Sequence, residues 1–591
     1  MKLLLTAINA KYIHSNLAVY SLKAYAEKYG CEAALAEYTI NHRTDYILQE
    51  LYKKKPDVLM FSCYIWNIAQ VTELAEELHK LRPELPIWVG GPEVSYECET
   101  FLQENPGITG IMRGEGEATF LELCRYYEER EKRGGNAGME CLSQPEKLSG
   151  IPGIVYRNSQ GVITATADRP PLAMDDLPFC YESLADFSHR IVYYESSRGC
   201  PFRCSYCLSS VEKSLRFRSL SLVYRELEFF LEHQVPQVKF VDRTFNCKHD
   251  HAMAIWRFLK EHDNGVTNFH FEISADLLTE EELTLLTSLR PGQVQLEIGV
   301  QSTNHRTVEE IRRTMDLERL EDVVRRVKEQ KNIHQHLDLI AGLPYEDYGT
   351  FQKSFDRIYR LHPEQLQLGF LKVLKGSYMY ENRKAYGIRY HGKPPYEVMA
   401  TNWISYDEIG KIKQVEEMLE VYYNSGQFEM TMQVLELVFP SPFELFLKLG
   451  QYYEAQELMS MSHSRIRRCE ILLDFVRLWD PEHREIYQEM LTFDLYYREN
   501  MKSRPSWAPE LSSYREERRR ICGKQKNVHL EPFYYDFTGL LEHMPRRRGE
   551  YPVFYLFFYE KKNPLTGQAQ VRAVTDDLQE REERDISADS G

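Results

Sequence analysis

Three cysteines in one short loop constrain this chain more than any other feature of its sequence. Cys200, Cys204 and Cys207 follow an apolar run at C-x3-C-x2-C spacing. Zinc sites and ordinary iron–sulfur sites usually take four protein ligands, and the sequence offers no fourth cysteine close to these three. The loop therefore predicts an iron–sulfur cluster with one iron left open. The alternatives are a zinc loop and a set of buried thiols, although free core cysteines have no reason to adopt this spacing.

The composition restricts where the chain works and what it binds. A length of 591 residues exceeds what one hydrophobic core supports, so several domains are expected. A formal net charge of −16 argues against a general nucleic-acid binder. No apolar run of about 18 residues is present, so we expect no membrane segment and no signal peptide. Scattered cysteines and an oxygen-sensitive cluster together predict free thiols in a reducing cytoplasm.

Residues 1–132 alternate short apolar strands with amphipathic helices, which predicts a Rossmann-like parallel sheet. Ligands of such sheets bind beyond the carboxyl ends of the strands. Ser62 ends one predicted strand and Gly90-Gly91 ends the next, where paired glycines let a bulky ligand approach the backbone. The predicted strands are 2–8, 57–62, 86–90 and 108–113, and the predicted helices lie near 15–29, 67–81 and 116–131.

Residues 191–375 repeat strand and helix six times, which predicts a partial (β/α)6 barrel of the TIM type. Chemistry in such barrels gathers at the carboxyl ends of the strands. The cysteine loop follows the first predicted strand, Asp242-Arg243 closes the second, Ser274 ends the third and Glu297 lies near the end of the fourth. The predicted strands are 191–196, 237–242, 269–274, 294–299, 336–341 and 365–370.

The other segments carry less information. Residues 133–190 are expected to be a connector with a β-hairpin between 153 and 166. Residues 376–575 are expected to form a mainly α-helical domain of unknown role, which ends in a hairpin between 553 and 574. In that domain the aromatic stretch 533–537 and the arginines 546–548 belong either to core and a solvated turn or to a contact with an anionic or planar substrate. The charged tail, 576–591, is expected to be disordered.

The cysteine loop resembles the signature of the radical S-adenosylmethionine (SAM) superfamily in its spacing, in Gly199 before it and in Tyr206 before its last cysteine. The resemblance implies a [4Fe-4S] cluster whose fourth iron is chelated by SAM. Ser62 with Gly90-Gly91, and the run Gly114-Glu115-Gly116-Glu117, resemble motifs of cobalamin-binding domains fused to such enzymes. Residues 1–375 thus resemble the cobalamin-dependent radical SAM family. The C-terminal third is similar to an uncharacterised domain found in one subset of that family.

The resemblance also implies roles for the strand ends. Asp242 and Arg243 stand where family members bind the methionyl group of SAM, Glu297 and Gln301 belong to a segment near the ribose, and Gly342 lies in a run near the adenine. The alternative for the polar residues is that they cap helices or are solvated strand ends. The expected metal ligands are Cys200, Cys204 and Cys207, and the expected cofactor-binding residues are Ser62, Gly90, Gly91, Asp242, Arg243, Ser274, Glu297, Gln301 and Gly342.

One loop departs from the pattern of the cobalamin-binding family. Domains whose histidine coordinates cobalt carry Asp-x-His-x-x-Gly, whereas this chain has Tyr12 and Leu17 in place of the aspartate and the glycine around His14. Without a carboxylate to orient the imidazole, we expect that His14 does not bind cobalt. The plainer alternative is that His14 is an ordinary polar loop residue.

The expected function is that of a methyltransferase for an unactivated carbon, working through a 5'-deoxyadenosyl radical and methylcobalamin. A radical rearrangement or cyclisation without net methyl transfer is one alternative, because fold does not decide function. A non-catalytic cobalamin or redox sensor is another. The expected partners are a small-molecule substrate of unknown identity and an electron donor such as flavodoxin or ferredoxin; no membrane and no nucleic acid are expected.

Overall fold

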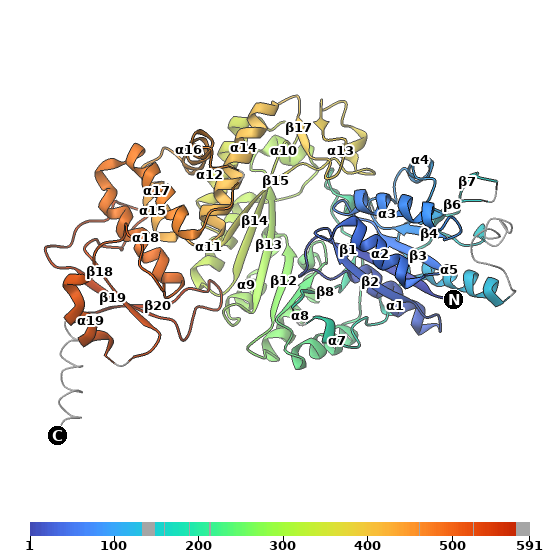
Figure 1. Cartoon of the computed structure of the whole chain (residues 1–591), viewed down its shortest axis with the longest axis horizontal. Coiled ribbons are helices and arrows are strands. Elements are labelled where there is room, and N and C mark those ends of the chain that lie inside the picture. The colour runs from blue at the N-terminus through green and yellow to red at the C-terminus, as the bar shows by residue number, and fades with distance from the viewer. Residues whose placement is uncertain are drawn as a thin grey trace, which may run out of the picture.

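The computed structural model describes residues 1–132, 148–158, 160–187, 189–211, 214–459, 461–523 and 525–574. Its three parts follow one another in chain order from right to left in Figure 1: a first sheet, a central sheet of long strands and a helical C-terminal region. Within the described residues, no helix has both the length and the apolar composition needed to cross a membrane.

The first sheet has seven strands in the order β2-β1-β3-β4-β5-β6-β7, of which β1 to β5 pair in parallel. Alternate residues of β1 face opposite layers, because Leu3 and Leu5 pack with α1 and α5 whereas Leu4 packs with α2 and α3. The elements are β1 Leu3–Asn9, α1 Leu17–Lys28, β2 Ala34–Thr39, α2 Thr44–Lys54, β3 Val58–Ser62, α3 Ile68–Leu81, β4 Ile87–Gly90, α4 Cys98–Glu104, β5 Gly110–Met112 and α5 Glu117–Lys132.

The four predicted strands of this sheet are confirmed, but the sequence analysis missed β2 and α2. β2 is an edge strand with the sequence ALAEYT, and its Ala, Leu and Glu favour helices over strands. Packing against β1 overrides that local preference.

The predicted hairpin is confirmed as β6 Ile154–Arg157 and β7 Ile163–Ala165, and it extends the first sheet in antiparallel fashion. The extended segment that follows β7 is bound to the barrel by Arg218. The Arg218 guanidinium donates to the carbonyls of Met174 at 2.5 Å and Leu177 at 3.0 Å. The same guanidinium pairs with buried Glu226 at 2.5 and 2.8 Å. This segment is therefore held by charge as well as by apolar contact.

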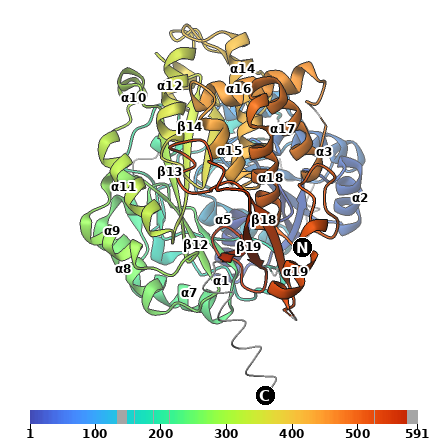
Figure 2. The same ribbon diagram turned by 90° about the vertical axis from the view of Figure 1, so that its left-hand side faces the viewer.

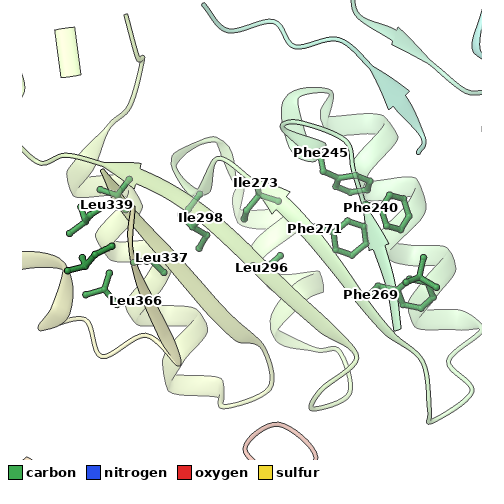
Figure 3. Packing of buried hydrophobic residues seen from close by; sticks show 14 of the residues in the cluster. Phe240, Phe245, Phe269, Phe271, Ile273, Leu296, Ile298, Leu337, Leu339 and Leu366 are labelled. Atoms are coloured by element: carbon green, nitrogen blue, oxygen red, sulfur yellow. The ribbon is translucent and has the colours of Figure 1, made fainter. Parts of the chain in front are cut away.

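Six parallel strands form the predicted partial barrel, in the order β15-β14-β13-β12-β11-β8. Residues such as Phe271, Ile298 and Leu337 alternate along these strands and pack on the helical side (Figure 3). The strands are β8 Val192–Tyr194, β11 Gln237–Phe240, β12 Asn268–Ile273, β13 Val294–Gln301, β14 His334–Ala341 and β15 Gln365–Phe370, and the main helices are α7 Leu220–Glu232, α8 His249–Glu261, α9 Glu280–Thr287, α11 Leu317–Gln330 and α12 Tyr348–Tyr359.

The C-terminal region contacts strand β15 through α14 and the residues 420–424 that follow it. In Figure 2 its helices α14 to α18 lie to the right of β13 and β14. Asn424 bonds both the N–H and the carbonyl of Leu366 at 3.0 and 2.9 Å, which occupies part of the edge of strand β15. Its elements are α14 Tyr406–Leu419, α15 Glu429–Glu436, α16 Pro442–Ala455, α17 Arg465–Trp479, α18 Arg484–Arg498, α19 Arg515–Cys522, β18 Val528–Phe533, β19 Val553–Phe558 and β20 Gln570–Val574.

The predicted C-terminal hairpin is confirmed as β19 and β20, and the sequence analysis missed the third strand, β18. In the aromatic stretch 533–537, Phe533 and Phe537 pack with Phe493 of α18, and the Arg547 guanidinium lies 5.1 Å from the ring centre of Tyr534. These contacts match the prediction that the aromatic stretch belongs to the core and that the arginines lie in a turn. The predicted disordered tail falls outside the described residues.

Residues 372–400, called the strap below, leave β15 and cross the ends of the barrel strands. The strap contains α13 Tyr378–Glu381, β16 Arg389–Tyr390 and β17 Val398–Ala400. The N–H of Met379 donates to the carbonyl of Ser205 in the cysteine loop at 2.9 Å. Val398 covers Gly342 so closely that a Cβ on the glycine would lie 2.6 Å from a methyl group of the valine.

The other side of the strap contacts the loop that follows β4 in the first sheet. The Tyr380 hydroxyl donates to Glu97 at 2.8 Å, and the Tyr396 hydroxyl donates to Glu93. The strap therefore joins the cysteine loop, the barrel and the first sheet.

Loss of the Arg218 side chain should destabilise the fold. In the Arg218→Ala variant, Glu226 stays buried without its cation, which costs about 3–5 kcal/mol in comparable sites. Thermal unfolding followed by circular dichroism should show a lower midpoint than the parent protein. Arg225→Ala, which removes an exposed arginine of α7, the helix that carries Glu226, is the matched control. Equal midpoints for the two variants would contradict the assignment.

Candidate functional site

Two cavities meet at the carboxyl ends of the strands. The cysteine-loop cavity, about 190 Å³, is lined by the cysteine loop and the ends of β11 to β14. The sheet-edge cavity, about 740 Å³, lies between the first sheet and the start of the barrel. Ser209 and Arg243 line both cavities. A molecule at this junction would therefore contact the contents of both.

Cys200, Cys204 and Cys207 all line the cysteine-loop cavity. The loop begins after β9 Ser197–Arg198 and is held at Ser205, whose N–H donates to the carbonyl of Ile311 at 2.9 Å. Among the described residues, no three His, Cys, Asp or Glu side chains are close enough together to hold a single metal ion.

Cys31, Cys63, Cys98, Cys124, Cys180, Cys247 and Cys469 are free thiols, and Cys141 lies outside the described residues. Cys247 does not line either cavity. Burial raises the pKa of Cys247 to about 11, so it is a neutral thiol rather than a ready metal ligand.

Asp242, expected to bind SAM, is buried behind the cysteine loop and lines neither cavity. It accepts hydrogen bonds from the Ser196 N–H at 3.0 Å, from the Ser196 hydroxyl at 2.7 Å and from the Ser197 hydroxyl at 2.5 Å. Its carboxylate therefore fixes the start of the loop that carries the cysteines. The structure does not bring Asp242 to the candidate site.

Charged side chains line the inner face of the barrel, opposite the apolar residues of Figure 3. Glu297 bonds Lys239 and His270, both at 2.9 Å. Burial acts to raise the pKa of Glu297, but these two partners outweigh it and hold the pKa well below its ordinary value. Asp338 pairs with His336 at 3.1 Å. Two of the three carboxylates of this cavity therefore have cationic or histidine partners.

Glu272 is the third carboxylate of the cysteine-loop cavity, and no hydrogen bond or ion pair within the described residues holds it. Burial, with a contribution from the Glu297 charge, raises the pKa of Glu272 to about 7. The sequence analysis did not select it, although it stands two residues before Ser274 and so shares the inner face by strand alternation.

Ser274 and Gln301 line the same cavity as expected, whereas Gly342 does not and lies beneath Val398 of the strap. Arg313, which was also missed, lines the cavity and donates to the carbonyl of Gly299. Its guanidinium hydrogen-bonds Cys204 as well. Arg313 therefore places positive charge at the thiol end of the cavity.

Ser62, Gly90 and Gly91 line the sheet-edge cavity. The amide of Asn16 donates to the Ser62 hydroxyl at 3.0 Å. Gly91 has a φ of 116°, and a Cβ there would lie 2.5 Å from the carbonyl oxygen of Cys63. The glycine is thus required by the packing of neighbouring strand ends, and a bulky substitution would disturb the fold before it affected any ligand.

The sheet-edge cavity combines a stacked aromatic pair with polar groups. Tyr64 and Trp66 line it with their rings 4.4 Å apart and nearly parallel. A wide cavity with flat apolar surface and scattered hydrogen-bonding groups fits a large planar molecule with polar substituents, such as a corrin.

His14 also lines the sheet-edge cavity, and its Nδ1 lies 2.5 Å from the hydroxyl of Tyr193 on β8. Burial lowers the pKa of His14 and raises that of Tyr193 to about 12. The sequence analysis found no partner for His14, because Tyr193 belongs to a distant segment that only the fold brings close.

Arg198, two residues before Cys200, joins the two halves of the site. It pairs with Glu117 at 2.6 Å, Glu195 at 2.8 Å and Glu115 at 3.6 Å. The two glutamates of the Gly-Glu-Gly-Glu run thus point at the cysteine loop, and the run connects the first sheet to the barrel.

Three protein-family models match the chain in succession. The B12 binding domain matches residues 3–124, the Radical SAM superfamily matches residues 194–358, and a protein of unknown function, DUF4080, matches residues 384–554.

Among relatives, the cobalamin-dependent radical SAM methyltransferase TokK of Streptomyces tokunonensis is 26% identical over 57% of this chain and 50% of its own length. The hopanoid C-3 methylase of Methylococcus capsulatus is 24% identical over 49% of this chain and 53% of its own. The anaerobic magnesium-protoporphyrin IX monomethyl ester cyclase of Rubrivivax gelatinosus is 21% identical over 54% and 57%. This chain spans about half the length of each of these relatives.

Two solved structures show the same fold. The cobalamin-dependent S-adenosylmethionine radical enzyme OxsB, with aqua-cobalamin and S-adenosylmethionine bound, gives a TM-score of 0.56 at 17% identity, over 83% of this chain and 79% of OxsB. The radical S-adenosylmethionine methyltransferase TsrM of Kitasatospora setae gives 0.51 at 18% identity, over 66% and 77%.

The raised pKa of Glu272 makes a prediction about stability. A glutamate with an ordinary pKa of 4.5 when unfolded and about 7 when folded stabilises the fold fully below about pH 4.5 and loses that contribution as the pH rises through 7. As the pH is raised from 5 to 8, the melting midpoint of the parent protein should therefore decrease relative to that of Glu272→Gln. The decrease should correspond to a loss of up to about 3 kcal/mol in the free energy of unfolding. Glu381→Gln, which changes an exposed glutamate, is the control. A constant difference across this range would show that Glu272 does not titrate as described.

Proposed function

Because the chain belongs to the radical SAM enzymes that carry a B12-binding domain, we propose that it is a methyltransferase acting on an unactivated carbon. Its cofactors are a [4Fe-4S] cluster, SAM and cobalamin. The observation that carries the proposal is the junction of the two cavities at Ser209 and Arg243. A substrate carbon there would be exposed to both cofactor systems. Methyltransferases among the relatives support this choice.

When bound, the cluster with SAM supplies hydrogen abstraction from an unreactive C–H bond and cobalamin supplies a methyl group. The chain's own residues hold and orient these groups. Cys200, Cys204 and Cys207 would provide the thiolates, and the Arg313 guanidinium beside Cys204 would stabilise the negative charge of a cluster there. Asp242 would act indirectly, by fixing the loop at Ser196 and Ser197.

In this proposal Ser62, Gly90 and Gly91 would contact cobalamin, and Ser274, Glu297 and Gln301 would contact SAM. The chain would divide into five segments at 1–132, 133–190, 191–375, 376–575 and 576–591. The enzyme would work in the cytoplasm and receive electrons from a protein donor such as flavodoxin or ferredoxin.

A radical rearrangement or cyclisation is the second candidate, because the relatives also include a ring-forming cyclase. One experiment separates the two functions. The protein is purified and reconstituted without oxygen, then incubated with methyl-labelled SAM, hydroxocobalamin, a reductant and a cell extract. Label in a new small-molecule product supports methyl transfer. Formation of 5'-deoxyadenosine with no labelled product would reject it in favour of the second function.

The cysteine assignments predict the outcome of the same assay with variants. Replacing Cys200, Cys204 or Cys207 by alanine should abolish the bound cluster and reduce 5'-deoxyadenosine to background, because each provides one of only three thiolates. Cys247→Ala, the matched control, should keep both. A triple variant with four irons per chain and active SAM cleavage would contradict the assignment of these ligands.

The contact between His14 and Tyr193 predicts that His14 does not bind cobalt. Tyr193 places a neutral phenol, and not a carboxylate, against Nδ1 of His14, so the imidazole lacks the partner that normally raises its basicity as a metal ligand. Where the phenol donates to Nδ1, the imidazole proton is on Nε2, and a protonated nitrogen cannot coordinate a metal. Electron paramagnetic resonance of the cob(II)alamin state should show no splitting from an axial nitrogen. Splitting that disappears in His14→Ala would prove the prediction wrong. Splitting that appears only in Tyr193→Phe would show that the hydroxyl sets the tautomer.

A further inference from the structure

Arg243 differs from every other cation that lines the two cavities. Its side chain is exposed and lines both of them. Within the part of the chain that the structure describes, no hydrogen bond or ion pair engages its guanidinium. By contrast, Arg198 is surrounded by three carboxylates, and Arg313 donates to Gly299 and Cys204.

The carboxylates around the junction do not neutralise Arg243. Glu297 pairs with Lys239 and His270, and Asp338 pairs with His336. Glu272 is close enough for the Arg243 charge to lower its pKa slightly, yet no ion pair forms and burial still dominates. The junction of the two cavities therefore carries a guanidinium that no carboxylate of the described residues neutralises.

SAM itself is one source of an anion, through its methionyl carboxylate. A second cation, Arg313, lies at the thiol end of the cysteine-loop cavity, beside Cys204, which is the end where SAM would meet the cluster. Arg243 lies where this cavity meets the sheet-edge cavity. Arg243 therefore lies where the proposed function places the substrate, between the two cofactors. This inference rests on that proposed function.

We propose that Arg243 binds an anionic group of the substrate, a carboxylate or a phosphate. The planar guanidinium presents two parallel N–H donors that match either group. Such a contact would orient the substrate between the two cofactors, which makes Arg243 a specificity-determining residue. The substrate class is thus a small molecule that is negatively charged at neutral pH.

The test uses the full-length reconstituted enzyme and a protein-free extract of the cells that make it. Ion exchange at pH 8 divides the extract into an anionic fraction and a fraction of neutral and cationic molecules. Each fraction is added to the enzyme with methyl-labelled SAM, and both 5'-deoxyadenosine and labelled product are measured. The variants are Arg243→Ala, Arg243→Lys and, as control, Lys248→Ala, which removes an exposed cation of the same loop that lines neither cavity.

The anionic fraction should stimulate SAM cleavage by the parent enzyme. Arg243→Ala should need about 10 to 100 times as much of the anionic fraction to reach the same stimulation of SAM cleavage. Its cobalamin content and its slow SAM cleavage without extract are measured in parallel, so that loss of the substrate contact is distinguished from loss of a cofactor contact. Arg243→Lys should recover part of the effect, because it restores the charge without the planar fork. Lys248→Ala should behave as the parent.

Three results would overturn the proposal. Stimulation by only the neutral and cationic fraction, or by neither fraction, would mean that the substrate is not recognised as an anion. Loss of SAM cleavage without extract in Arg243→Ala would assign the residue to SAM. Loss of cobalamin would assign it to the corrin. Stimulation by the anionic fraction without labelled product would reject methyl transfer and still support the role of Arg243.

Discussion

The ion-pair cluster around Arg198 is the constraint on which the arrangement of the site depends. The Arg198 side chain is only 15% exposed, so its charge is stabilised by carboxylate partners. It receives them from both Glu195 of its own segment and Glu117 at the start of helix α5. The cysteine loop and the sheet-edge cavity are therefore fixed relative to each other by charge. If the first sheet moved away together with α5, Arg198 would lose Glu115 and Glu117 and would keep only Glu195 as a carboxylate partner.

The sequence predicted the elements whose patterns were strong. Six buried strands, each bounded by turn residues, were sufficient to predict the barrel, and its strand order follows from parallel connections. β2 and β18 were missed for different reasons. β2 consists partly of residues that favour helices, and β18 contains Pro532 and a buried Glu531 that pairs with Arg504. In both strands, tertiary contacts outweigh local preference.

The candidate site was predictable where residues are close in the sequence or stand at strand ends. The cysteines and Glu297 line the expected cavity. Gly91 was selected for the approach of a ligand, although its contact with Cys63 is sufficient to require a glycine. Tyr193 and Arg313 could not be found from the sequence, because they reach His14 and Cys204 from distant segments. Local sequence patterns do not predict such long-range contacts.

The strap has a consequence for how the protein is made. Synthesis proceeds from the N-terminus, and domains generally fold as they emerge, so the first sheet and the barrel strands can form before residues 372–400 exist. Until then Gly342 has no Val398 above it, and Glu93 and Glu97 lack their tyrosine partners. The contacts that join the first sheet, the cysteine loop and the barrel through the strap are thus completed only after all three of these parts have left the ribosome. A message cut short after the barrel would encode every cysteine of the loop and yet produce a protein in which the loop lacks its backbone hydrogen bond from Met379 to Ser205.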